Sequence, residues 1–405
     1  MTEIEQLSEK LNQNYPLYKE TALTHRRIKH QNLLPLIEKA GKAGTFKIQM
    51  LGTSVENRSI YALSAGTGKT KVLLWSQMHG DEPTATQALF DIFNFFNHPQ
   101  ILSNEAENIL NKLNLHFIPM LNPDGAEVFK RRNALNIDLN RDALRQIARE
   151  TQILKKYRDT LLPDFGFNLH DQNPYYTAGA TNKPATLSFL APAYNPEKDI
   201  DEKRENSMQV IALMNTVLQK FIPGQIGRYF DAYGPTSMGD NMQKWGTRTI
   251  LIESGEYDPF NDPERQYVRK LNFIAILSAL QAIANHSYTA VNQAEYWKIP
   301  EIKDAKMFHL IIRNARIYAS GQYFKTDIGI HLNEEPTDNS FLLQSEVYDL
   351  GDLSFYHAYK EIDADGAVIK DFNRNHLILN IGDTADFILE KDNKQLLKLK
   401  NGKII

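Results

Sequence analysis

Histidine, aspartate and glutamate are the side chains with which this sequence could bind zinc, because its 405 residues include no cysteine. Two of its eleven histidines stand three residues before a glutamate: His79 with Glu82, and His331 with Glu334. Catalytic zinc sites keep three protein ligands and an open position for water, whereas structural zinc sites favour cysteine. The composition therefore points to a catalytic site.

The context of the two His-x-x-Glu pairs differs. His79 closely follows the apolar run 72–75, and Glu82 comes just before a predicted helix. α/β proteins place their sites at the carboxyl edge of such strands. His331 and Glu334 instead lie within or beside a predicted β-hairpin, with no further ligand nearby. We interpret that second pair as surface polar residues.

A third ligand is needed beside His79 and Glu82, and His170 is the best candidate. It ends the apolar run 165–169 and is followed by polar residues. A single histidine at a strand end is more often only hydrogen-bonded, so the position alone does not decide its role. The motifs around it favour a metal ligand.

Further motifs stand in a fixed order between and after these histidines. Asn-Pro-Asp-Gly occupies 122–125, Arg-x-Asn occupies 131–133, and Asp-x-Asn-Arg occupies 138–141. His170 and Glu253 then follow, each at the end of an apolar run. Together with the first His-x-x-Glu pair, this order resembles the zinc carboxypeptidase family over roughly residues 45–285. The N-terminal segment and the residues after 300 lie outside the resemblance.

The resemblance implies one Zn²⁺ ion per chain, held by His79, Glu82 and His170. Asp138 matches the family's acid behind the first histidine, where a carboxylate fixes the ligand's tautomer. Its position before a predicted helix also permits a helix-capping role. Glu253 matches the general base, which takes a proton from water and delivers it to the leaving amine.

Other residues match the family's substrate contacts. Arg131 would stabilise the developing oxyanion, and the alternative for the basic run 130–132 is a solvated surface. Asn140 and Arg141 would grip the substrate's terminal carboxylate, since the guanidinium fork binds carboxylates through two hydrogen bonds.

Two positions depart from the family pattern. The mobile tyrosine that closes over the substrate falls by spacing on Asp231, so either Tyr229 or Tyr233 substitutes, with Tyr233 our candidate for a substrate contact, or the lid is absent. The specificity-pocket segment matches only approximately at 237–240. If Asp240 lines the pocket, it would favour basic side chains.

The elements that must position these residues alternate between strands and helices. Strands are expected at 45–51, 59–64, 71–77, 115–120, 164–169 and 247–252, and helices at 83–96, 141–157, 207–221 and 262–285. Alternation of this kind predicts an α/β domain whose mixed sheet carries helices on both faces.

The pattern of predicted secondary structure changes after Pro300. Several β-rich runs between turn signals, without a convincing amphipathic helix, predict a small all-β domain, most simply a sandwich. We therefore divide the chain into a catalytic domain at 1–298, which includes an N-terminal helical segment, and a β domain at 299–405.

Composition excludes several classes of function. The formal net charge of −3 gives no general attraction to nucleic acid or to anionic lipid. The first twenty residues are polar and lack the features of a secretory signal, and no uninterrupted apolar stretch is long enough to cross a bilayer. We therefore expect a cytoplasmic protein without a nucleic-acid or membrane partner.

The predicted function is zinc-dependent hydrolysis of a peptide or amide bond beside a free carboxylate, which releases a C-terminal residue. The substrate would be a peptide or an acyl amino acid. Alternatives on the same scaffold are an N-acyl amino acid deacylase and an amidase for muropeptides or γ-glutamyl peptides. A catalytically inactive binding module remains the alternative from a different class, as does a scaffolding protein whose β domain binds a partner.

Overall fold

The computed structural model describes residues 2–304, 307–338 and 340–405, which form two compact units. The second unit consists of 174–184, 258–263 and 303–405, and the first unit contains the rest. The predicted boundary, 1–298 and 299–405, differs in the two short segments and at 299–302, which belong to the first unit. The segment 174–184 joins the second unit through contacts distant in sequence, since Thr177 pairs with Lys303 and Tyr175 stacks on His331. Phe260 of the segment 258–263 packs against the core of the second unit. Residues 305–306 and 339 of the predicted β domain lie outside the described residues.

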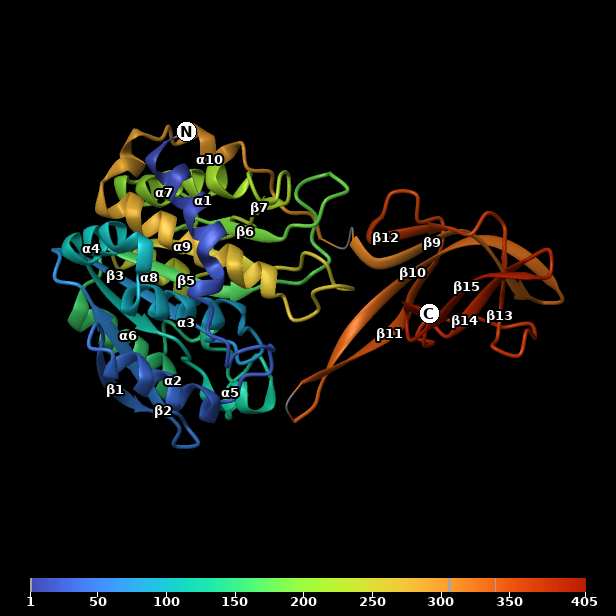
Figure 1. Cartoon of the computed structure of the whole chain (residues 1–405), viewed down its shortest axis with the longest axis horizontal. Helices are drawn as coiled ribbons and strands as arrows, with labels where there is room; N and C mark the ends of the chain where they lie inside the picture. Colours follow the sequence, from blue (N-terminus) through green and yellow to red (C-terminus); the bar gives the residue numbers. More distant parts are fainter. Residues whose placement is uncertain (1, 305–306, 339) are drawn as a thin grey trace. The chain divides into compact units, whose positions relative to one another are not determined.

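The first unit is built on one mixed sheet of eight strands in the order β1-β2-β4-β3-β5-β8-β6-β7 (Figure 1). Neighbours β4, β3, β5 and β8 run parallel, whereas β1, β2 and β6 pair antiparallel with their neighbours on the β4 and β8 side. The strands are β1 (Lys47–Thr53), β2 (Ser59–Ala65), β3 (Thr70–Ser76), β4 (Leu113–Ile118), β5 (Phe165–Asp171), β6 (Leu187–Leu190), β7 (Ile226–Arg228) and β8 (Arg248–Ser254).

Helices cover both faces of this sheet, as predicted. The α-helices of the unit are α1 (Glu3–Asn14), α2 (His30–Lys42), α3 (Thr84–Asn97), α4 (Ser103–Lys112), α5 (Pro123–Val128), α6 (Arg149–Leu161), α7 (Glu202–Leu218), α8 (Met238–Lys244), α9 (Gln266–Ala284) and α10 (Ala294–Trp297). Short 3₁₀ turns are η1 (Tyr15–Leu17), η2 (Gln100–Leu102), η3 (Leu139–Arg141) and η4 (Ser287–Ala290).

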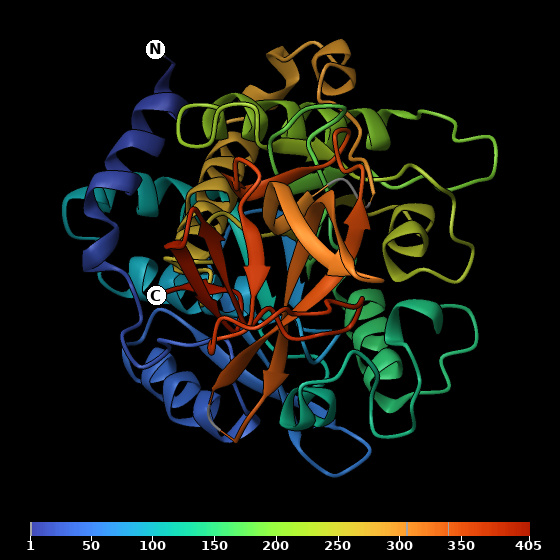
Figure 2. The ribbon, with the colours of Figure 1, turned by 90° about the vertical axis from the view of Figure 1, so that its right-hand side faces the viewer.

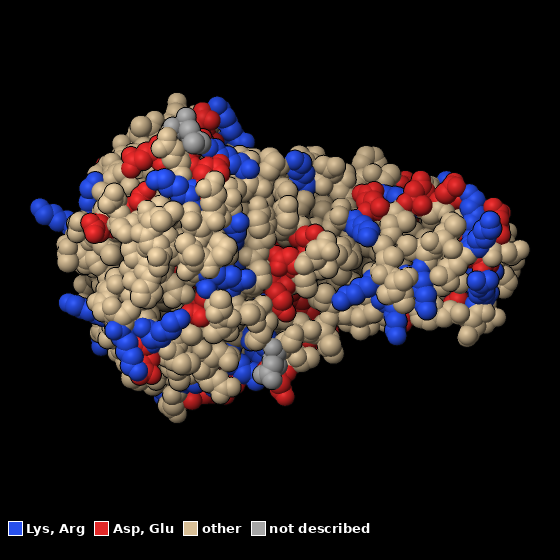
Figure 3. Space-filling model, viewed as in Figure 1, with Lys and Arg blue, Asp and Glu red and all other residues tan. Residues whose placement is uncertain are grey.

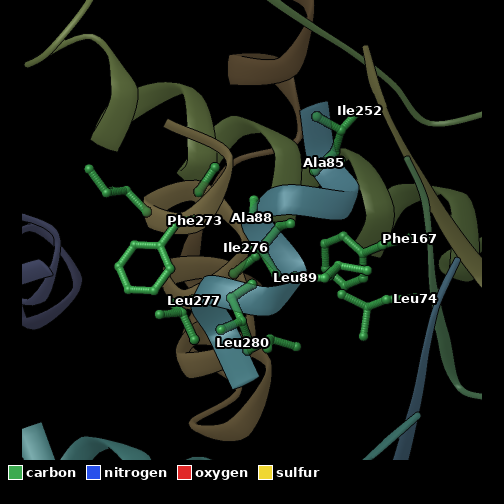
Figure 4. Packing of buried hydrophobic residues seen from close by; sticks show 14 of the residues in the cluster. Leu74, Ala85, Ala88, Leu89, Phe167, Ile252, Phe273, Ile276, Leu277 and Leu280 are labelled. Carbon is green, nitrogen blue, oxygen red and sulfur yellow. The ribbon is translucent and has the colours of Figure 1, made fainter. Parts of the chain in front are cut away.

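The strands bury both faces because their apolar residues run without alternation. Leu74 of β3 lies in the cluster that includes α3 and α9, whereas its neighbours Leu73 and Trp75 lie in a second cluster with Leu154 of α6 and Met242 of α8. Figure 4 shows the first cluster, with side chains of the central strands meeting those of α3 and α9: Leu74, Phe167, Ile252, Ala85, Ala88, Leu89, Phe273, Ile276, Leu277 and Leu280.

Helix α9 is apolar over almost its whole circumference. Its 19 residues satisfy the length and composition of a membrane-spanning helix, yet 89% of that apolar window is buried inside the protein. Because α9 packs between α3, α7 and α1, this composition is explained by burial within the first unit.

The N-terminal segment is anchored by a buried ion pair. Asp91 on α3 and Arg269 on α9 are both fully buried, with Arg269 Nη2 lying 2.5 Å from Asp91 Oδ1. The hydroxyl of Tyr15 and the backbone N–H of Glu20 donate to the same carboxylate, and Arg269 donates to the carbonyl of Leu23. One charge pair therefore joins the N-terminal segment to two core helices.

The second unit is all-β, as predicted. Its eight strands hydrogen-bond into one sheet in the order β11-β10-β9-β13-β14-β15-β16, with β12 pairing with β9 (Figure 2). They are β9 (Met307–Ala319), β10 (Gln322–Pro336), β11 (Phe341–Gly351), β12 (His357–Asp363), β13 (Val368–Lys370), β14 (Phe387–Lys391), β15 (Lys394–Lys400) and β16 (Lys403–Ile404).

Two local predictions were wrong. The helix expected at 141–157 begins only at Arg149, because the Asp142 carboxylate accepts the backbone N–H groups of Ile147 and Ala148 at 2.9 Å and holds a loop there. His331 is buried in a stack of aromatic rings and is not a surface residue. Burial lowers the pKa of His331 to about 3, so this histidine is neutral at physiological pH.

Charged side chains are mixed in sign on the surface of the first unit that Figure 3 shows. This mixture agrees with the small net charge of −3.

Candidate metal centre

The predicted site residues meet at the carboxyl ends of three neighbouring parallel strands, β3, β5 and β8. His79 lies three residues after the end of β3, and Glu82 lies two residues before the first turn of α3. His170 on β5 and Glu253 on β8 are paired in the strand register, so their side chains lie on the same face of the sheet. The end of each apolar run therefore delivers a polar group to one edge.

His79, Glu82 and His170 form a compact group of metal-ligating side chains. Among the described residues, their ligand atoms all lie within 4.8 Å of one another, and all three residues are buried. Glu82 Oε1 is 2.7 Å from His79 Nδ1, and Glu82 Oε2 is 2.6 Å from His170 Nδ1. The two Nδ1 atoms are 3.1 Å apart.

This arrangement fits a divalent cation better than a proton. The Nε2 of His79 faces Asp138 Oδ1 at 3.1 Å and its Nδ1 faces Glu82, so carboxylates stand at both ring nitrogens. The Nδ1 atoms of His79 and His170 also face each other, and two N–H groups cannot both occupy that 3.1 Å gap. Ligands of tetrahedral zinc, at about 2.0–2.2 Å from the ion, are separated by roughly 3.3 Å. Two imidazoles and one carboxylate are thus a suitable donor set.

The charges of the site shift its pKa values in opposite directions. Burial alone would raise the pKa of Glu82, but the adjacent rings of His79 and His170 hold it below its usual range. Burial lowers the pKa of His170, whereas Glu82 and Asp138 outweigh burial and raise that of His79. Hydrogen bonding to His79 also outweighs burial at Asp138 and lowers its pKa. Both carboxylates are therefore ionised at neutral pH.

Asp138 lies behind His79, and Arg131 lies beside His79 and Glu82. Arg131 Nε donates to Asp138 Oδ2 at 3.0 Å, and Arg131 Nη1 lies 3.0 Å from His79 Nδ1 and 3.3 Å from Glu82 Oε1. Asp138 also accepts the backbone N–H of Asn140 at 2.9 Å. The Arg131 side chain is 42% exposed, so its cation has room to turn towards a substrate.

Gly80 of the His-x-x-Glu segment packs closely against Gly125 of the Asn-Pro-Asp-Gly segment. A Cβ on Gly80 would lie 2.0 Å from the backbone carbon of Gly125, which only glycine avoids. Asn122 adds side-chain hydrogen bonds at 3.3 Å to the carbonyls of Met78 and Arg131. This segment therefore joins the backbone before His79 to the backbone of Arg131.

The Glu253 side chain is buried beside the metal-ligating group, and its carboxylate accepts no hydrogen bond from the described residues. Burial, together with the negative charges of Glu82 and Asp171, raises its pKa well above the ordinary value. A raised pKa suits a group that must both accept and return a proton near neutral pH. The nearby Glu256 does not share this environment, because it forms an ion pair with Arg265 at 3.8 Å.

Asn140 and Arg141 lie together against the start of α8. Asn140 Oδ1 accepts the backbone N–H of Met238 at 2.8 Å, and Arg141 Nη1 donates to Ser237 Oγ at 3.4 Å. The Arg141 residue is exposed, which leaves guanidinium N–H groups available for a carboxylate. Asn140 is linked to the histidines through Asp138.

The predicted lid residues lie in the loop before α8, and the predicted pocket residue Asp240 lies in the first turn of α8. Tyr233 is half-buried there, and none of its described hydrogen bonds joins it to the histidines. Asp231, on which the family spacing falls, is bound to the buried Arg204 at 2.7 Å. Asp240 Oδ1 accepts the backbone N–H of Gly234 at 2.9 Å, and burial raises the pKa of Asp240 to about 6. The lid and the pocket preference stay predictions.

Comparison with known proteins gives a consistent family. The model of the zinc carboxypeptidase family matches residues 39–174, which include the predicted metal ligands and Asp138, Arg131, Asn140 and Arg141. A probable carboxypeptidase 2 of Arthroderma benhamiae is 28% identical over 150 residues, which cover 36% of this chain and 23% of that protein. Carboxypeptidase SOL1 of Arabidopsis thaliana is 42% identical over 65 residues, covering 16% of this chain and 13% of that protein. The matched stretches thus span less than a quarter of these relatives.

Solved structures share the fold. The thrombin activatable fibrinolysis inhibitor aligns over 71% of this chain and 81% of its own, with a TM-score of 0.54 and 13% identity. A metallo-carboxypeptidase from Burkholderia cenocepacia aligns over 64% of this chain and 69% of its own, with a TM-score of 0.51 and 17% identity. Residues 39–174 of this chain therefore match the zinc carboxypeptidase family, and the fold is similar to that of a solved metallo-carboxypeptidase.

Proposed function

We propose that this chain is a zinc-dependent exopeptidase that hydrolyses a peptide or amide bond next to a free carboxylate and releases the C-terminal residue. The observation that carries the proposal is the convergence of His79, Glu82 and His170 at one sheet edge, with Glu253 in register beside His170. The family match over these ligands supports the same activity.

Each residue of the site has a task in this reaction. His79, Glu82 and His170 would hold one zinc ion, which, when bound, polarises the scissile carbonyl and makes water a nucleophile near neutral pH. Glu253 takes the proton from the attacking water and passes it to the leaving amine. Arg131, whose guanidinium already lies beside Glu82, donates hydrogen bonds to the oxygen that becomes negative.

Substrate orientation falls to Asn140 and Arg141. Their side chains lie at the start of α8, where Arg141 is exposed and Asn140 is held by Met238. A carboxylate bound by the guanidinium fork would place the adjacent amide bond towards the zinc ligands, because Asp138 joins Asn140 to His79. A substrate with a free carboxylate is favoured for this reason.

A peptide panel tests the proposal. Matched peptides with free and amidated C-termini are incubated with the zinc-loaded protein, and the released residue is measured. Cleavage of the free peptides and its loss upon amidation are expected. Glu253→Gln should reduce the rate by about 10²–10⁴-fold while zinc binding persists, since it removes the proton acceptor alone. Equal cleavage of amidated peptides would contradict the exopeptidase assignment.

Adding further substrates to this panel separates the amidohydrolase alternatives. N-acyl amino acids and peptides containing D-Glu or γ-glutamyl linkages also carry a free carboxylate and would meet Arg141 in the same way. Hydrolysis of these compounds without hydrolysis of ordinary L-peptides would assign the chain to an amidase of acyl amino acids or muropeptides.

A further inference from the structure

Asp171, the residue after His170, neither binds the metal nor transfers a proton in the proposed reaction, yet its side chain is only 5% exposed. Since successive side chains of a strand point to opposite faces, Asp171 lies on the other face of the sheet from His170. Its Oδ2 accepts the hydroxyl of Thr84 at 2.7 Å and, more weakly, the backbone N–H of Thr84 at 3.4 Å. Thr84 begins α3, two residues after Glu82.

One carboxylate thus joins the two segments that carry the ligands His170 and Glu82. The backbone adds a second link, because the N–H of Asp171 donates to Glu82 Oε2 at 3.3 Å. The two ligands are 88 residues apart in the chain, so their separation depends on contacts of this kind.

Two buried arginines lie near the Asp171 carboxylate. Arg26 Nη2 and Arg265 Nη1 lie 3.6 Å and 4.0 Å from Oδ2, and their side chains are 3% and 6% exposed. Arg26 comes from the N-terminal segment, outside the residues that match the family. Its backbone N–H donates to the Glu264 carboxylate at 2.7 Å. Burying a carboxylate is costly, and burial raises the pKa of Asp171 to about 6 although the two arginines and the hydroxyl of Thr84 favour its ionised form.

We propose that Asp171 is a positioning residue for the metal site, which fixes the end of β5 against the first turn of α3 so that His170 and Glu82 keep their separation. The inference rests on the proposed function only in taking those two residues as zinc ligands. A preorganised ligand pair binds metal more tightly, and residues supporting metal ligands typically contribute 10–100-fold in affinity.

A purely structural role would give a different result, and Asp91 supplies the control. Asp91, which lies on α3, is also a buried carboxylate with an arginine partner and a backbone N–H donor. Unlike Asp171, it contacts neither His170 nor Glu82. Both Asp171→Asn and Asp91→Asn should lower the melting temperature of the metal-free protein. Only Asp171→Asn should weaken zinc binding.

The experiment measures zinc affinity by competition with a chromogenic chelator, alongside thermal unfolding of the metal-free full chain. Asp171→Asn should bind zinc about 10–100-fold more weakly than the unmodified chain. Thr84→Val should weaken it in the same direction by less, and Thr84→Ser, which keeps the hydroxyl, should restore it. These Thr84 variants keep the test decisive if Asp171→Asn fails to fold.

Two results would overturn the inference: zinc affinity of Asp171→Asn and Thr84→Val within about twofold of the unmodified chain, or equal weakening by Asp91→Asn. In either case a zinc-binding parent chain would leave the proposed function standing. A parent chain that binds no zinc would remove the metal site itself, and Asp171 could then position no ligand.

Discussion

Carboxyl groups with opposite pKa shifts lie around the two histidines of the site. Glu82 and Asp138 are held below their usual pKa by the imidazoles they contact, whereas Glu253 is raised by burial and by negative neighbours. Divergent pKa values among adjacent carboxyl groups mark different chemical roles. The first two suit ligand and orienting roles, and Glu253 suits proton transfer.

Asp240 allows a pH-dependent test of substrate preference at the same scale. Because burial raises its pKa to about 6, the carboxyl is neutral below that pH and negative above it. If Asp240 lines the pocket, the ratio of kcat/KM for peptides ending in Lys over those ending in Leu should rise between pH 5 and 7. Asp240→Asn should give a flat ratio.

The outcome against this assignment is a ratio that does not change with pH in the unmodified chain, or that rises equally in Asp240→Asn. Either would mean that Asp240 only holds the loop through its hydrogen bond to Gly234.

Single residues were predictable where an apolar run ends in a polar group. His79, His170 and Glu253 follow such runs, and the structure brings them together at one edge. The roles of Asp171 and Arg26 could not be found in this way. These residues lie 145 positions apart, and nothing local in the sequence indicates that their side chains meet.

At the scale of elements, the turn at Gly80 depends on close contact with α5. An alanine Cβ there would lie 2.0 Å from the backbone carbon and 2.2 Å from the next backbone nitrogen, and neither can move without shifting the helix. We expect Gly80→Ala to destabilise the fold by about 1–3 kcal/mol and to weaken zinc binding, because the turn carries His79 and Glu82.

Denaturant unfolding measures this effect, with Gly52→Ala as the control. A Cβ on Gly52 would meet only the end of the flexible Ile153 side chain at 2.8 Å, so its loss of stability should be smaller. Equal stability of Gly80→Ala and the unmodified chain would show that the contact is not needed.

Longer elements were predicted better than short ones. The helices at 83–96 and 262–285 correspond to α3 and α9, whose apolar residues extend over several turns. Helix α8 was not predicted, since its seven residues are too few for a periodic pattern. The structure shows that the start of this helix contacts Asn140 and Arg141.

At the scale of the whole molecule, the α/β fold follows from the alternation of strands and helices before residue 300, and the all-β unit from the β-rich runs after it. The assignment of 174–184 and 258–263 to the second unit does not, because it results from tertiary contacts. These two segments follow β5 and β8, the strands that carry His170 and Glu253. A covalent connection thus runs from each of these strands into the second unit.

The central claim is that His79, Glu82 and His170 form a zinc site, and metal content tests it most directly. The full chain is stripped with a chelator, reconstituted with zinc, dialysed and measured by elemental analysis, with His170→Ala as the matched control. We predict one zinc per chain in the unmodified protein, the same in Glu253→Gln, and far less in His170→Ala. Absence of stoichiometric zinc in the unmodified protein would contradict the account.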